Sequence, residues 1–146
     1  MTKYYCVMQE DKYDCGIAAL ATILFYFNHN YTLEELKHLI SYNPNTLTNF
    51  FQLHSLANQL GFNSIGYTLD SLDLFAKIEL PCIAQISFNN DILHFVVIFK
   101  INNNKVLISD PFYGLKTILT NNFSKYFTGN ILVITPKKHL LKRKHK

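Results

Sequence analysis

Apolar residues in the first half of the chain recur at helical spacing. The run after Asp14 is apolar on nearly every side, which predicts a buried helix with Asp14 as its N-cap. Thr32 and Glu35 form a capping-box pattern ahead of a second helix. A third helix is expected from about residue 46 or 48 to residue 60, with Gly61 as its stop. The first half is therefore predicted to be helical.

The second half of the chain carries short runs rich in β-branched and aromatic residues, which are typical of strands. Three asparagines at 102–104 separate two of these runs and predict a hairpin. A block of helices followed by a block of strands predicts an α+β fold with an antiparallel sheet. The expected strands are Pro81–Ser87, Ile92–Ile101, Lys105–Asp110, Leu115–Thr120 and Asn130–Thr135, with one short helical turn at Phe123–Phe127.

The charge distribution argues against a nucleic-acid-binding protein. The chain has 146 residues, 49% of them hydrophobic, which suits one domain with a sizeable core. Its net charge is +4, but six of the 14 Lys and Arg lie in residues 137–146. The remainder has eight basic and ten acidic residues, a net charge of −2, and lacks a basic footprint. We expect one domain over 1–136, followed at 137–146 by a solvated basic tail or the start of a linker to a membrane domain.

The cysteines point to a reducing compartment. Cys6, Cys15 and Cys82 are odd in number and form no CxxC pair, so we expect no disulfide framework. Residues 1–9 do not resemble a secretory signal. The longest nearly apolar run, 17–27, would rise only about 16 Å as a helix, short of the roughly 30 Å core of a bilayer.

Cys15 is the first candidate for chemistry, because it stands at the start of the buried helix. A helix N-terminus lowers a thiol pKa, and the cysteine's own N–H can donate to an oxyanion. Gly16 would let a substrate backbone approach the sulfur. Asp14 opposes thiolate formation unless its charge is directed into the helix amides as a cap. The alternative is a buried, inert cysteine.

His94 is the second candidate, because it interrupts an apolar strand. Across the predicted hairpin, Asp110 falls opposite Val96 or a neighbour and on the same sheet face as His94. Such a carboxylate fixes the tautomer of an imidazole and stabilises its charged form. Cys15, His94 and Asp110 therefore form a plausible Cys–His–Asp set for acyl transfer. A hydrogen-bonded core histidine is the alternative.

The segment QEDKYDCG, residues 9–16, resembles the Q-x-D-x-x-D-C-G motif of the bacteriocin-processing peptidases. These are papain-like domains at the N-terminus of peptidase-containing ABC transporters. The similarity continues through TLEEL, HFVVIFKI, KVLISDPFYG and FSKYFTGNILVI, and so covers nearly the whole chain. The chain departs from the family at Asn45-Thr46, where a Gly-Thr pair is common.

The resemblance implies roles for individual residues. Cys15 matches the nucleophile, His94 the base and Asp110 the orienting carboxylate, and Gln9 matches the side chain that donates to the oxyanion. Tyr13 and Leu93, which flank catalytic positions, are candidates with Gly16 for the walls of the substrate slot. No metal or other cofactor is implied.

The resemblance also implies a function. The family removes a leader peptide after a Gly-Gly-type site, at the cytoplasmic face of the membrane, within a transporter that has transmembrane and ATP-binding domains. The expected partners are a double-glycine precursor peptide and those domains, with no nucleic acid; no phosphate-binding loop occurs in this chain.

Three alternatives remain. The first is a non-catalytic leader-binding domain. The second is another papain-like enzyme that acts on amides, such as a transglutaminase or an amidase. The third is a metal site at Cys15, His94 and Cys82, although these residues lack the ligand spacing of known zinc motifs.

Overall fold

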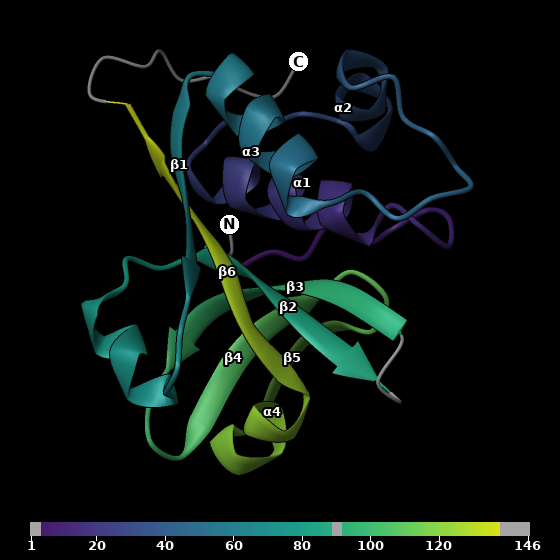
Figure 1. Ribbon diagram of the computed structural model, residues 1–146. Helices are drawn as coiled ribbons and strands as arrows, with labels where there is room; N and C mark the ends of the chain where they lie inside the picture. Colours follow the sequence, from purple (N-terminus) through teal and green to yellow (C-terminus); the bar gives the residue numbers. More distant parts are fainter. Residues whose placement is uncertain (1–3, 89–91, 138–146) are drawn as a thin grey trace.

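Helices occupy the first half of the chain and a single antiparallel sheet most of the second, as the sequence predicts (Figure 1). The structure is a computed structural model that describes residues 4–88 and 92–137. The basic tail predicted at 137–146 lies outside the described residues, except for Lys137. The helices are α1 Cys15–Tyr26, α2 Leu33–Leu39, α3 Phe50–Gln59 and α4 Thr120–Tyr126, with a 3-10 helix, η1, at Leu72–Lys77. The strands are β1 Phe62–Thr68, β2 Cys82–Phe88, β3 Ile92–Ile101, β4 Lys105–Asp110, β5 Gly114–Leu119 and β6 Phe127–Pro136.

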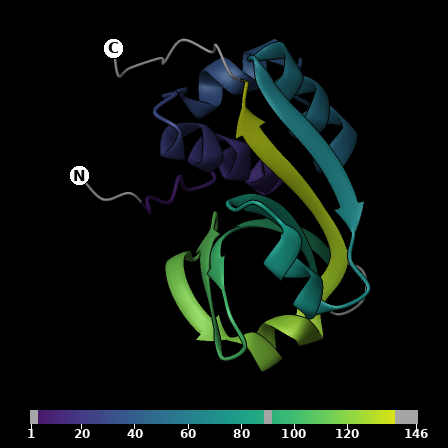
Figure 2. The ribbon, with the colours of Figure 1, turned by 90° about the vertical axis from the view of Figure 1, so that its left-hand side faces the viewer.

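The sheet separates two hydrophobic cores. Its strand order is β1-β6-β2-β3-β4-β5. Helices α1, α2 and α3 gather on one side of the sheet, whereas η1 and α4 lie at its other end, where the strands curl round (Figures 1 and 2). Strand β3 serves both cores, since Phe95 and Val97 pack on the helical side and Val96 and Ile98 on the other. Strand β3 therefore lies between the two cores and contributes side chains to both.

Capping side chains set where two of the helices begin. The capping box at α2 is confirmed, because Thr32 and Glu35 bond reciprocally at 3.0 Å. The prediction that α3 starts at residue 46 or 48 was wrong. Asn49 accepts from the Gln52 N–H at 2.8 Å, and the Gln52 side chain accepts from Asn49, so the helix begins at Phe50. Gly61, at a φ of +90°, ends α3 as expected.

The hairpin of β3 and β4 has the predicted bounds, but the sequence did not predict β1. Strand β1 is an edge strand that pairs with β6 alone, and it is interrupted by polar residues and a glycine, which are poor strand formers. Most of its side chains are exposed, so it lacks the apolar run typical of a buried strand. Helix α4 is also longer than the single turn predicted at Phe123–Phe127.

The first turn of α1 packs directly on β3. Every residue from Cys15 to Leu24 is buried. A Cβ on Gly16 would lie 3.1 Å from side-chain atoms of both Leu53 and Phe95, so a side chain at this position would force these neighbours to shift. Among the described residues, no helix has the length and apolarity needed to cross a membrane. The packing of α1 fixes the start of the helix next to the strand that carries His94.

Packing of α3 against α1 and β1 predicts the outcome of two truncations on the same helix. Leu56 is fully buried, whereas Phe51 is 74% exposed. Replacing Leu56 with alanine should lower the free energy of unfolding by about 2–5 kcal/mol, because it leaves a cavity. Phe51→Ala should change it by less than about 0.5 kcal/mol, although it removes more atoms. Urea denaturation followed by circular dichroism measures both, and an equal loss for the two variants would contradict this packing.

Candidate active site

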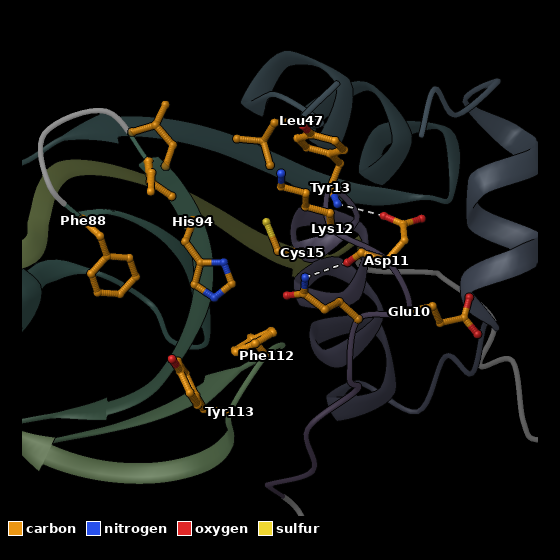
Figure 3. Close-up of a pocket in the computed structure, with 13 residues that line it drawn as sticks. Glu10, Asp11, Lys12, Tyr13, Cys15, Leu47, Phe88, His94, Phe112 and Tyr113 are labelled. Atoms are coloured by element: carbon orange, nitrogen blue, oxygen red, sulfur yellow. Dashed lines mark hydrogen bonds between the residues drawn. The ribbon is translucent and has the colours of Figure 1, made fainter. Parts of the chain in front are cut away.

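A cleft of about 820 Å³ opens between the start of α1 and the N-terminal end of β3 (Figure 3). One wall is the loop before α1, residues 9–13, together with Cys15. The opposite wall is His94 with apolar side chains of β2 and β3. Phe112 and Tyr113, which follow β4, line the cleft beside His94. The cleft therefore brings segments from both halves of the chain together.

His94 and Asp110 form a direct hydrogen bond across the β3–β4 hairpin. The Nε2 atom of His94 lies 2.7 Å from Oδ1 of Asp110. Val97 pairs with Ser109, which places Asp110 opposite Val96 as the hairpin register predicts. Oδ1 of Asp110 also accepts from the backbone N–H of Phe112 at 2.9 Å. Because the Asp110 side chain is only 1% exposed, these bonds fix the orientation of the carboxylate.

The electrostatics of this pair favour a charged imidazole. Burial lowers the pKa of His94, but hydrogen bonds and charge interactions with Asp110 and Cys15 outweigh burial and raise it to about 9. Burial likewise opposes ionisation of Asp110, yet its interactions with His94 and with backbone N–H groups hold its pKa below the ordinary value. The ring is therefore an imidazolium at neutral pH, with Nδ1 left to face the cleft.

Cys15 is the first residue of α1 and is 2% exposed. Cys15 and the ring of His94 lie on facing sides of the cleft (Figure 3), and their interaction contributes to the raised pKa of His94. The thiol lies at the positive end of the helix, where the first backbone N–H groups have no partner within the helix. A carbonyl placed beside the sulfur would meet those N–H groups.

Gln9 belongs to the same wall as Cys15. Its Nε2 donates to the carbonyl of Asp11 at 2.8 Å, which uses one of its two N–H groups. Its backbone N–H donates to the carbonyl of Pro111 at 2.9 Å, so the loop is tied to the turn that follows β4. Gln9 Oε1 is buried and has no partner among the described residues. The second amide N–H is left to bond a group in the cleft.

Asp14 stands at the N-cap position of α1, as predicted, but its side chain makes no capping bond, so its charge is not directed into the helix amides. The fully buried carboxylate instead accepts from the backbone N–H groups of Glu10 and Asp11 at 3.0–3.2 Å. Lys37 of α2 pairs with it at 2.8 Å. Sequence reasoning did not identify Lys37. A buried carboxylate is costly without a neighbouring cation, and Lys37 supplies that cation.

The three weaker candidates for the substrate slot have different positions. Tyr13 and Leu93 line the cleft, on opposite walls. Gly16 is not among the lining residues, and its packing against Leu53 and Phe95 accounts for the glycine. Sequence reasoning also missed the aromatic lining: Phe112 and Tyr113 are 60% and 67% exposed. Their position directly after the predicted Asp110 could have indicated them.

No group of three His, Cys, Asp or Glu within residues 4–88 and 92–137 is arranged to hold a metal ion. Cys82, the third member of the metal alternative, lies in the core on the other side of the sheet from Cys15. The side chains that face the cleft suit acyl transfer, because a thiol, an imidazolium and two kinds of N–H donor meet there.

A helical half packed on an antiparallel sheet, with a cysteine at a helix N-terminus facing a strand histidine, defines the papain-like class of cysteine peptidase folds. The sequence matches the family described as Peptidase C39 over residues 3–139, and the chain belongs to that family. It is 30% identical over 132 residues to the lactococcin-G-processing and transport ATP-binding protein LagD of Lactococcus lactis. The match covers 90% of this chain but only 19% of that protein.

Two solved structures share the whole fold. The peptidase domain of Streptococcus ComA, a bifunctional ABC transporter involved in quorum sensing, is 26% identical with a TM-score of 0.83. That alignment covers 92% of this chain and 99% of the ComA domain. A double-glycine-motif protease from an AMS/PCAT transporter, solved with its leader peptide, is 28% identical with a TM-score of 0.80 and covers 90% of this chain and 91% of that one. Together with LagD, the relatives include proteins that process and transport bacteriocins.

The raised pKa of His94 can be measured directly. In an NMR titration of the wild type, the His94 ring should lose its proton near pH 9. Asp110→Asn removes the negative charge beside Nε2 and should move this midpoint down by at least one unit. His38 of α2 and His54 of α3 serve as internal references in the same spectrum, since Asp110 does not contact them. A His94 midpoint that is the same in both proteins would contradict the assigned cause.

Proposed function

We propose that this chain is a cysteine endopeptidase domain that removes a leader peptide after a Gly-Gly-type site from a precursor peptide. The observation that carries the proposal is that Cys15, at a helix N-terminus, shares one cleft with His94, which is hydrogen-bonded to the buried Asp110. Membership of the Peptidase C39 family supports it. The names of the relatives that process bacteriocins support the substrate class.

In this proposal Cys15 is the nucleophile. Its thiolate attacks the carbonyl carbon of the scissile bond, and the oxyanion accepts from the Cys15 backbone N–H and from the Gln9 amide. His94, charged at neutral pH, then gives its proton to the leaving amine, which is the start of the released peptide. Water hydrolyses the remaining thioester, with His94 taking its proton. Asp110 keeps Nε2 bonded and so directs Nδ1 to the reaction.

The specificity for glycine follows from exclusion. Tyr13 and Leu93 line opposite walls of the cleft that holds Cys15 and His94. A slot between such side chains admits a bare backbone and rejects larger residues by steric clash. The aromatic surface beside His94, formed by Phe112 and Tyr113, is available to apolar residues of the leader. Binding energy gained there helps to position the scissile bond.

We infer that the domain works at the cytoplasmic face of a membrane, attached to the transmembrane and ATP-binding domains of a transporter. The chain spans about a fifth of the length of LagD, in which processing and transport are named together. In this arrangement residues 1–136 form the peptidase domain, and 137–146 form a basic tail or the start of a linker. Lys and Arg in such a linker suit the cytoplasmic side of a membrane.

Two alternatives use the same fold. A non-catalytic leader-binding domain needs no Cys–His–Asp set. The presence of Cys15 and His94 in one cleft, with Asp110 bonded to His94, therefore favours the enzyme. Another amide-directed enzyme, such as a transglutaminase, would use the same three residues and differ in substrate. The nature of the substrate is therefore what the experiment must test.

Cleavage of a synthetic leader peptide tests the proposal. The wild type should cut a double-glycine peptide after the second glycine, and Cys15→Ser should lower the rate by at least about 10³-fold while the circular dichroism spectrum is unchanged. A matched peptide with Ala-Ala at the site should be cut at least about 100-fold more slowly, because the methyl groups clash with the slot. Mass spectrometry of the products measures the cleavage site and the rate for each enzyme and each peptide. Persistent cleavage by Cys15→Ser, or equal cleavage of the two peptides, would refute the proposal.

The role of Gln9 makes a separate prediction. Gln9→Ala removes one oxyanion donor, so kcat should fall about 10²–10³-fold. KM should change little, because the bond forms only in the transition state. Steady-state kinetics with the same peptide distinguish the two parameters. A loss confined to KM would mean that Gln9 binds the substrate and does not stabilise the oxyanion.

A further inference from the structure

The carboxylate of Asp14 is buried directly before the proposed nucleophile. Its side chain is 0% exposed, and the ammonium group of Lys37 lies 2.8 Å from it. Two backbone N–H groups, those of Glu10 and Asp11, donate to this carboxylate. A buried charge that loses its partner is strongly unfavourable. Without Lys37, the negative charge of Asp14 would oppose the thiolate of the neighbouring Cys15.

Lys37 also reaches the rest of the loop before α1. Its Nζ lies 3.3 Å from Glu10 and 3.4 Å from Asp11. Burial lowers the pKa of Lys37, but its bonds and charge interactions with these carboxylates outweigh burial and raise the pKa above the ordinary value. The cation therefore stays charged, and helix α2 is anchored to the loop at three points.

The network ends at the proposed oxyanion donor. Asp11 accepts from the hydroxyl of Tyr42 at 2.7 Å through its side chain, and from Gln9 Nε2 at 2.8 Å through its carbonyl. Lys37 sits over the ring of Tyr42, 5.0 Å from its centroid. The position of the Gln9 amide thus depends on a loop whose charges are compensated from α2.

We propose that Lys37 is a positioning residue of the active site, which neutralises Asp14 beside Cys15 and holds the loop that presents Gln9. This inference rests on the proposed function, since it assigns Lys37 to the same catalytic machinery. Lys37 does not line the cleft and acts only through its neighbours.

The charge effect can be tested without any peptide. Alkylation of Cys15 by iodoacetamide at pH 7, followed by mass spectrometry of the peptide that contains Cys15, should be about tenfold slower in Lys37→Met than in the wild type. Lys37→Arg should keep the wild-type rate, because the charge remains. The double variant Asp14→Asn/Lys37→Met removes both charges and should return to within about threefold of the wild type.

Lys100→Met is the matched control. Lys100 also sits over a tyrosine ring, that of Tyr4, at 5.0 Å, but it belongs to β3 at the end remote from His94. Its removal should leave the alkylation rate unchanged. A wild-type rate in Lys37→Met would overturn the charge role. A double variant as slow as Lys37→Met would also overturn it, because a purely structural defect is not repaired by removing a second charge.

The effect on the loop is tested by a double-mutant cycle with Gln9. Lys37→Met should lower kcat for leader cleavage about tenfold and change KM less than about twofold. In a Gln9→Ala background the same substitution should cost less than about twofold, because the group that it positions is gone. Additive losses would overturn the loop role. Absence of cleavage by the wild type would refute the proposed function instead, and the alkylation comparison would still decide the role of Lys37.

Discussion

The close packing of α1 on β3 is the constraint on which the site depends. Gly16 allows the first turn of the helix to contact Phe95, and each of these residues is next in sequence to a proposed catalytic residue. Contact between Gly16 and Phe95 therefore brings Cys15 and His94 to the same cleft. A side chain in place of Gly16 would press on Leu53 and Phe95, so this glycine belongs to the core and affects the proposed chemistry only through the packing of α1 on β3.

Two ion pairs, His94–Asp110 and Lys37–Asp14, set the charges around Cys15. Asp110 stabilises the positive charge of His94, whereas Lys37 compensates the negative charge of Asp14. Each carboxylate is buried and also accepts backbone N–H groups, which offsets the cost of removing it from water. The result is a cleft in which an imidazolium is stable and the nearest carboxylate of the helix start is neutralised.

The sequence was sufficient to predict the hairpin and its consequences. The bounds of β3 and β4 and the pairing of His94 with Asp110 follow from the two-residue period of strands and from a recognisable turn. The side chain of Asp14 could not be predicted, because a carboxylate at an N-cap has two competing sets of N–H donors and the choice depends on Lys37. The start of α3 was misjudged, since Asn49 is a stronger cap than the threonines before it.

The segment before α1 ties the two halves of the site to each other. The backbone N–H of Val7 donates to the hydroxyl of Thr22 within α1 at 3.0 Å, and that of Gln9 donates to the carbonyl of Pro111 at 2.9 Å. Thr22 is a polar residue in a buried helix, and its hydrogen bond with Val7 explains why a hydroxyl group is found there. The same short segment thus contacts the helix of the proposed nucleophile and the turn that follows Asp110. A shift of either half would move the Gln9 amide, so the proposed oxyanion donor is aligned only when both halves are correctly packed.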